Sequence, residues 1–110
     1  MDEAFVERIF NCEGQPLVCR WFMPERRDYV TEEGASGEEY HCRWSIAWPW
    51  QEETRTSVGI DGVQALMLAM RTVATHLDES EAYRSGKLTY LDEPSLMLPP
   101  VWGSFPSERG

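Results

Sequence analysis

The stretch Asp61-Gly-Val-Gln-Ala-Leu-Met-Leu-Ala-Met-Arg-Thr-Val-Ala-Thr-His-Leu77 decides the fold, because it carries the one long helical pattern of the chain. Asp61 has a side chain suited to a helix N-cap, and Gln64 follows three residues later, which is the spacing of a capping box. Apolar residues then recur at the intervals of one helical face, namely Val63, Leu66, Met67, Met70, Val73, Ala74 and Leu77. The stretch therefore predicts an amphipathic helix over residues 61–77 that packs on a sheet.

Segments with strand character stand on both sides of this helix. The clearest is 40–50, where alternation places Cys42, Trp44, Ile46 and Trp48 on one face. Glu13-Gly-Gln-Pro16 is a turn signal between two apolar segments, which predicts a hairpin. The predicted strands are 4–12, 17–23, 40–50, 54–60 and 87–91. This order predicts an α+β fold, an antiparallel β-sheet of four to five strands with one long amphipathic helix packed on one face.

Two segments lack these patterns. Residues 24–39 hold six acidic residues and two glycines, and we expect a mobile surface loop there. Long loops of this kind tend to be functional or disordered, so the loop is a candidate binding surface. From residue 99 the chain is rich in proline and cannot form regular helix or central strand. We therefore predict a single domain over 1–110, with a folded body at 4–98 and a Pro-rich tail at 99–110.

The charge balance restricts the classes of partner. The chain has 110 residues, with 19 acidic and 10 basic, for a formal net charge of −9. Such a chain repels phosphate backbones and anionic lipid, so we expect no direct nucleic-acid partner, no membrane partner, and a basic protein if the partner is charged. The three cysteines form no CxxC motif, no apolar stretch reaches the length of a membrane span, and from the acidic residues 1–8 we expect no export signal. These features predict reduced thiols and a cytoplasmic protein.

The sequence evidence for a catalytic or metal-binding site is weak. His41, Cys42 and His76 fit neither the number nor the spacing of metal ligands, and alternation places His41 and Cys42 on opposite strand faces. Adjacent carboxylates such as Glu52 and Glu53 stand in predicted turns, where they are solvated rather than held in a dry pocket. No Gly-rich phosphate loop, GxSxG or HExxH motif occurs. We predict no enzymatic activity, no cofactor and no metal site.

The candidate partner-binding residues combine acidic groups of the 24–39 segment with aromatic anchors. Carboxylates there would meet a positive cleft, and tyrosines or exposed tryptophans would anchor the contact. The set is Asp28, Tyr29, Glu32, Glu33, Glu38, Glu39, Tyr40, Trp50 and Trp102.

The segment Val58-Gly-Ile-Asp-Gly-Val-Gln-Ala-Leu-Met-Leu-Ala-Met70, together with Arg84-Ser-Gly-Lys-Leu-Thr-Tyr-Leu91, resembles a family of small bacterial α+β proteins classed as a domain of unknown function. The resemblance covers roughly residues 5–98, and its D-G-V-Q-A-L helix motif consists of a cap and an apolar face. It implies no activity for any residue here. Many small acidic bacterial proteins of this kind act as immunity proteins. This analogy rests on the class of protein and not on any residue of a binding site.

Three functions follow as hypotheses. The first is an acidic cytoplasmic interaction module, and specifically an immunity-type inhibitor that neutralises a basic toxin or nuclease. The second, from a different class, is a small-molecule-binding or enzymatic domain with a pocket between sheet, helix and tail. The third is an inhibitor that mimics nucleic acid by spacing carboxylates like phosphates.

Overall fold

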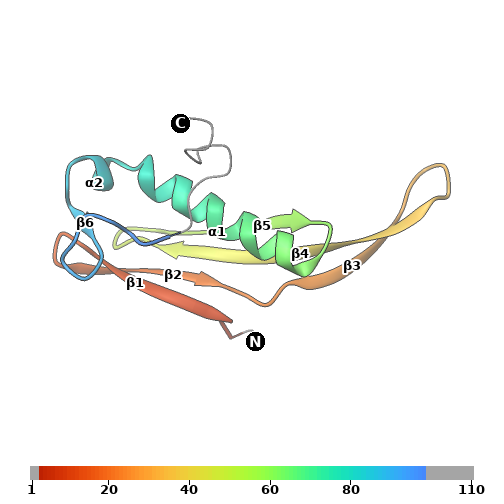
Figure 1. Ribbon diagram of the computed structural model, residues 1–110, viewed down its shortest axis with the longest axis horizontal. Coiled ribbons are helices and arrows are strands. Elements are labelled where there is room, and N and C mark those ends of the chain that lie inside the picture. Colours follow the sequence, from red (N-terminus) through yellow and green to blue (C-terminus); the bar gives the residue numbers. More distant parts are fainter. Residues whose placement is uncertain (1–2, 99–110) are drawn as a thin grey trace.

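A computed structural model describes residues 3–98 and confirms the α+β prediction (Figure 1). The sheet has six strands rather than four to five. In chain order the elements are β1 (Val6–Cys12), β2 (Gln15–Trp21), β3 (Glu25–Val30), β4 (Ser36–Ala47), β5 (Glu52–Gly59), α1 (Gly62–Asp78), α2 (Glu81–Arg84) and β6 (Leu88–Thr89). The predicted tail at 99–110, with Trp102, lies outside the described residues.

The sheet is built around β4, its longest strand. The hydrogen-bonded order is β3-β4-β2-β1-β6, and β5 pairs with the other edge of β4. β2 pairs with the second half of β4 and β3 with the first half, so β2 and β3 lie end to end along one edge. The backbone amide of Phe22, between them, donates to the carbonyl of Arg43 at 2.9 Å. All pairings are antiparallel.

The predicted β1–β2 hairpin is confirmed, with a two-residue turn at Glu13 and Gly14. Both residues have positive φ, 55° and 83°, which is the backbone of a type I′ turn. The Asn11 side chain supports the turn, since its Oδ1 accepts from the Gly14 amide at 2.8 Å. Gly14 occupies the left-handed region without the steric cost that a Cβ adds.

The prediction of a mobile loop over residues 24–39 is wrong, because most of this segment forms a strand pair. β3 pairs with β4 from Glu25↔His41 to Val30↔Ser36, so only the residues between the two strands form a turn. The strand pair formed by β3 and the first half of β4 has no deeply buried face, and every residue of β3 is exposed. The segment therefore lacks the alternation of apolar and polar residues by which a half-buried strand is predicted from sequence.

The helix α1 begins as predicted. Asp61 Oδ1 accepts from the Gln64 amide at 2.8 Å, and Gln64 Oε1 accepts from the amide of Ile60 rather than from that of the cap residue. The predicted inward face is correct in the second half, where Val73, Ala74 and Leu77 are buried.

In the first half of α1 the predicted face is correct for Leu66 and Met70, which are half-buried against the core, and wrong for Val63 and Met67. Val63 is 69% exposed and Met67 39%, whereas Ala65 and Ala69 are fully buried. The reason is a close approach at Gly59, where an added Cβ would lie 2.5 Å from the backbone nitrogen of Ala65. Small residues let the helix lie directly on the end of β5, and the side chains of Val63 and Met67 turn to solvent.

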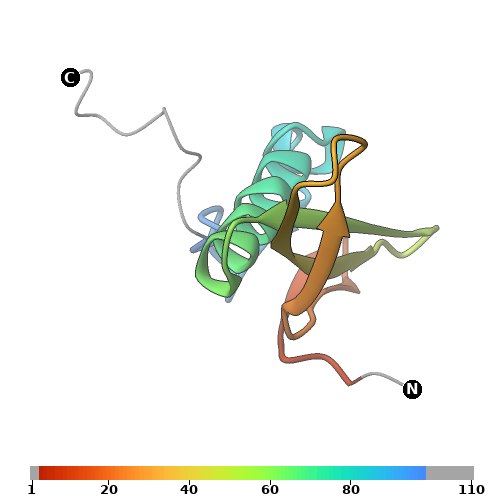
Figure 2. The same ribbon diagram turned by 90° about the vertical axis from the view of Figure 1, so that its right-hand side faces the viewer.

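The core lies between α1 and one face of the sheet. The strands contribute large side chains, including Phe10, Leu17, Trp21, Trp44 and Ile46, and α1 contributes its alanine, valine and leucine stripe. Figure 2 shows α1 on one side of the sheet, and no helix of residues 3–98 covers the other side. Cys42, Trp44 and Ile46 face the helix as the alternation predicts, while Trp48 is half-buried at the edge.

The segment after α2 folds back beside β1. β6 is only Leu88–Thr89, shorter than the predicted 87–91, because Leu91 and Asp92 adopt positive φ and end the ladder. Arg8 holds this segment from β1, with Nη1 donating to the carbonyls of Leu96 at 3.1 Å and Met97 at 2.6 Å. Within residues 3–98 no helix combines the length and apolarity that crossing a bilayer requires.

Candidate functional site

The most distinctive surface is the hairpin of residues 25–39, which we call the arm. β5 pairs with β4 from Ala47 only as far as Tyr40, opposite Gly59, after which the chain turns into α1. Beyond Tyr40, β4 is paired with β3 alone. The arm is therefore a two-stranded ribbon that projects past the helix and the rest of the sheet, at the right of Figure 1.

One face of the arm carries an ion-paired cluster on the same side of the sheet as α1. Arg26 stands opposite Tyr40, and Asp28 stands opposite Glu38. The guanidinium of Arg26 bridges both acids, with Nε 3.1 Å from Asp28 Oδ1 and 2.8 Å from Glu38 Oε1. Its hydrogen bond to Asp28 raises the pKa of Arg26 above its usual value. One positive charge thus offsets one of the two negative charges on this face.

The opposite face of the arm is also paired. Arg27 Nη2 lies 3.1 Å from Glu25 Oε1. His41 Nε2 lies 2.8 Å from Glu39 Oε2. Tyr29 is opposite Gly37 and packs across it.

The tip of the arm holds the two acidic residues of the arm that take no part in these ion pairs. The turn is closed by three hydrogen bonds: the Thr31 amide donates to the Ala35 carbonyl at 2.7 Å, and the Gly34 and Ala35 amides donate back to Thr31. Gly34 adopts a φ of 91°, which favours glycine. Glu32 and Glu33 are exposed there, and neither forms a salt bridge with a residue of the described range 3–98. They are two adjacent solvent-facing carboxylates on an ordered turn.

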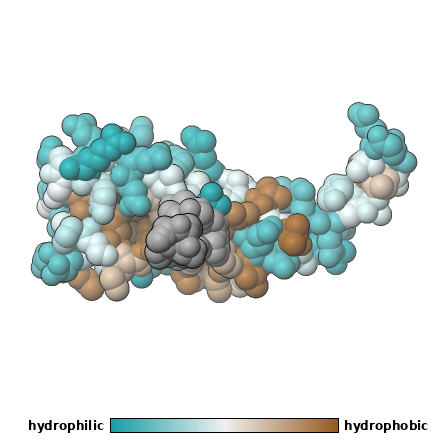
Figure 3. Space-filling view, turned by 45° about the horizontal axis from the view of Figure 1, so that its top comes forward, coloured by the Kyte–Doolittle hydropathy of each residue, from teal (hydrophilic) through white to brown (hydrophobic). Residues whose placement is uncertain are grey.

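The structure therefore brings together seven of the nine predicted site residues. Asp28, Tyr29, Glu32, Glu33, Glu38 and Glu39 lie on the arm, and Tyr40 lies at its base. Figure 3 shows the arm as a narrow projection with hydrophilic residues at its far end. Trp50 is 62% exposed, as expected of an anchor, but it belongs to another surface. Trp102 falls outside the described residues.

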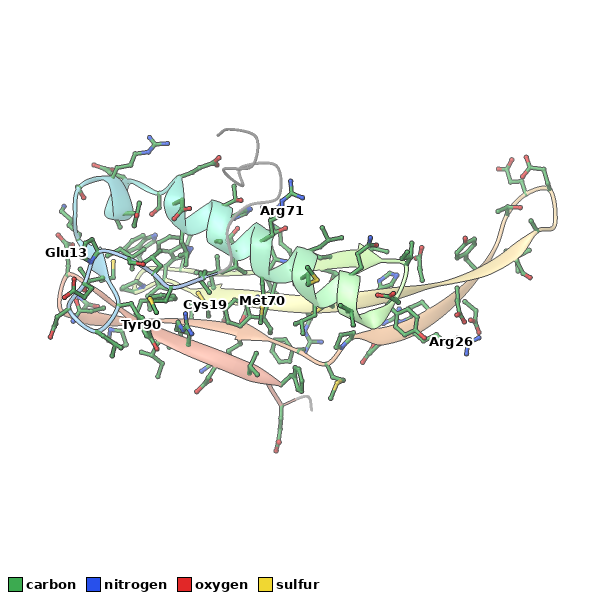
Figure 4. The ribbon with its side chains drawn as sticks, viewed as in Figure 1. Glu13, Cys19, Arg26, Met70, Arg71 and Tyr90 are labelled. Atoms are coloured by element: carbon green, nitrogen blue, oxygen red, sulfur yellow. The ribbon has the colours of Figure 1, made fainter. Side chains whose placement is uncertain are left out.

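Trp50 lines a cavity of about 370 Å³ at the end of the molecule away from the arm, which we call the Trp pocket. Trp48 and Trp50 stack there with ring centroids 5.3 Å apart and an interplanar angle of 24°. The β1–β2 turn and α2 supply the facing wall, including the ion pair between Glu13 and Lys87 at 3.1 Å. Figure 4 places Glu13 at this end and Arg26 toward the arm. The sequence singles out Trp50 but not the other residues of the pocket, since the lining comes from three regions that are distant in sequence, 12–13, 48–53 and 80–87.

A hydrogen-bonded network supports the inner wall of the Trp pocket. Glu53 accepts from Trp48 Nε1 at 3.3 Å, and its other oxygen lies 3.0 Å from His76 Nδ1. The His76 ring in turn packs edge-on against Trp44, with centroids 5.3 Å apart. Glu53 is thus a positioning residue in β5 with a side chain only 20% exposed, not a solvated turn residue.

The cysteines have the environment of core residues. Cys12, Cys19 and Cys42 are free and buried. Burial raises the pKa of Cys19 to about 12, and burial likewise raises the pKa values of Cys12 and Cys42. A thiol kept neutral in this way is a poor nucleophile. Across residues 3–98 no three His, Cys, Asp or Glu side chains gather as a metal site would require.

Comparison with known proteins gives a family but no activity. Neither the comparison with curated proteins nor that with solved structures finds a match. A family model described as a domain of unknown function, DUF6968, matches residues 6–100, nearly the range over which the helix motif and the closing segment show their resemblance. The chain therefore belongs to the DUF6968 family.

Proposed function

We propose that this protein is an acidic interaction module that binds a basic protein through the arm, and that its partner is a toxin or nuclease effector which it neutralises as an immunity-type inhibitor. The observation that carries the proposal is the position of Glu32 and Glu33 at the tip of a ribbon that protrudes from the body. A protruding, hydrogen-bonded hairpin can enter a cleft that a flat sheet cannot reach.

Charge supports the same partner class. Residues 25–39 hold six carboxylates and two arginines, so the arm carries four of the nine excess negative charges of the chain. The two arginines are held by carboxylates of the arm itself, which leaves the tip strongly acidic. Such a surface speeds encounter with a basic partner and makes the association depend on salt.

The preformed structure of the arm also supports a role in binding. Because the hairpin is already paired from Glu25 to Val30, its backbone does not have to become ordered in the complex. Binding by a preformed element avoids the entropic cost that a disordered acidic loop would incur.

The testing experiment is affinity capture from the source lysate with tagged protein at low and at high salt. We expect one basic protein to be retained at low salt and weakened at high salt. A variant with Glu32→Lys and Glu33→Lys should lose it, whereas Glu79→Lys with Glu93→Lys, which changes the net charge equally at the other end of the body, should retain it. The captured protein should also lose its toxic or nuclease activity when the wild-type protein is added. Retention by both variants alike, or no basic partner at either salt, would contradict the proposal.

A further inference from the structure

A second binding surface lies in the Trp pocket, which the proposed function does not use. Its walls come from three regions of the chain: Cys12 and Glu13 of the β1–β2 hairpin, residues 48–53 at the β4–β5 turn, and residues 80–87 around α2. The arm and this pocket are at opposite ends of the molecule (Figure 4). The two sites can therefore be altered independently.

The aromatic part of the pocket is held in place yet accessible. Trp48 is anchored by its hydrogen bond to Glu53, and Trp50 stacks on Trp48. Trp50 nevertheless remains 62% exposed, although a free tryptophan surface of this size favours burial. A planar group can stack on it without any rearrangement of the core.

The charges around the tryptophans favour a cation. Lys87 is matched by Glu13 at 3.1 Å, so these two charges cancel at the rim. Glu53 and Glu81 are the two further acids that line the pocket. Glu53 is shared with His76 and lies 3.6 Å from Arg55, whereas Glu81 is exposed at the mouth. An anion would face this excess of carboxylates, and a cation would be attracted by it.

We propose that the Trp pocket binds a guanidinium group, stacked on Trp50 and hydrogen-bonded to the carboxylate of Glu81. Guanidinium is planar, is weakly hydrated, stacks on aromatic faces and pairs with carboxylates through two parallel donors. A compact ammonium ion lacks the planar fit to the Trp48–Trp50 stack. The group can belong to a small free molecule or to an arginine side chain of a polypeptide.

The test is an NMR titration of the ¹⁵N-labelled full chain, observing the indole Nε1–H signals of Trp48 and Trp50. Three probes are compared: Nα-acetyl-arginine N-methylamide, its neutral isostere Nα-acetyl-citrulline N-methylamide, and a Gly-Gly-Arg-Gly-Gly peptide. We expect saturable shifts with both arginine compounds and none with citrulline. Tighter binding of the peptide assigns the site to polypeptide arginine, and equal affinity assigns it to a small molecule; both results support the pocket.

Variants separate this proposal from the proposed function of the arm. Trp50→Ala and Glu81→Gln change exposed residues and should each weaken binding of the arginine probe, the first by about tenfold. Tyr29→Ala, which removes an exposed aromatic from the arm, should bind the probe as wild type does. Equal shifts with citrulline, no shifts with arginine, or unaltered affinity in Trp50→Ala would each overturn the proposal, whatever the outcome of the arm experiments.

Discussion

Tyr29 lies across Gly37 on the facing strand of the arm, so closely that its hydroxyl oxygen would be 2.6 Å from a Cβ added at residue 37. The tyrosine ring covers a glycine that would otherwise leave the ribbon backbone open to water. An aromatic residue packed over a cross-strand glycine in this way stabilises a strand pair and helps to fix its register. The shape of the arm therefore depends on this contact.

Replacing Tyr29 with alanine should loosen the arm without unfolding the body. We expect faster amide hydrogen exchange across residues 27–39 and little change in the melting temperature, because the core makes no use of the ring. The matched control is Val30→Ala, which trims an exposed apolar residue that is 72% accessible on the same strand. Equal exchange in the two variants would show that the Tyr29–Gly37 contact does not order the arm.

Gly59 should tolerate no side chain. An added Cβ would lie 2.5 Å from the nitrogen and 2.9 Å from the Cα of Ala65, and helix backbone cannot move aside as a side-chain end can. We expect Gly59→Ala to lower the free energy of unfolding by about 2 kcal/mol or more, at the upper end of overpacking costs. Gly62→Ala is the control, since its Cβ would meet nothing nearer than 3.7 Å, and it should change stability by less than about 1 kcal/mol. Chemical denaturation of both variants gives the comparison, and equal stabilities would contradict the close approach.

Alkaline pH should destabilise the fold through its buried thiols. The pKa of Cys19 is about 12 in the folded chain against 9.0 for an unperturbed thiol, because burial disfavours the thiolate. Above pH 9 the unfolded chain loses this proton while the folded chain keeps it. The contribution to stability is therefore complete below pH 9 and is lost as the pH rises toward 12, at roughly 1 kcal/mol per pH unit for the thiol.

The measurement is the unfolding free energy between pH 9 and pH 10.5 for wild type and for Cys19→Ala. The variant should show a shallower decline, although Cys12 and Cys42, whose pKa values are also raised by burial, contribute in the same direction. Equal slopes would mean that Cys19 is not held as a neutral thiol.

Much of the body follows from sequence because its signals are local. Asp61 and Gln64 mark the start of α1, and Glu13-Gly14 between two apolar segments marks the first hairpin. The alternation of Cys42, Trp44 and Ile46 gives the face of β4. Each of these signals arises from one turn, one cap or one buried face.

The arm and the inner face at the start of α1 could not be predicted in the same way. Arg26 and Glu38 form an ion pair across the two strands of the arm, but in the sequence of either strand alone their charges are typical of a solvated loop. The exposure of Val63 results from the contact between Gly59 and Ala65, which needs the packing of α1 on β5 to be known. The Trp pocket is likewise a product of tertiary structure.

Arg26 should lower the net negative charge of the arm and thereby slow its association with a basic partner. Its guanidinium offsets one of the two negative charges of Asp28 and Glu38, and because all three side chains are exposed the pairs contribute little to stability. We expect Arg26→Gln to leave the melting temperature nearly unchanged and to increase the association rate with the captured basic partner at low salt. Arg84→Gln makes the same charge change on α2, away from the arm, and should have the smaller effect. A rate that falls in Arg26→Gln would place the guanidinium itself in the contact.

The association rate of the captured partner with Glu32→Lys/Glu33→Lys, measured beside Glu79→Lys/Glu93→Lys across a series of salt concentrations, tests the central claim most directly. If the arm tip leads the encounter, the first variant associates at least about tenfold more slowly at low salt and loses most of its salt dependence. The second variant then keeps both the rate and the salt dependence close to wild type. Equal rates for the two variants would contradict binding through the arm and would show that only the overall charge of the protein matters.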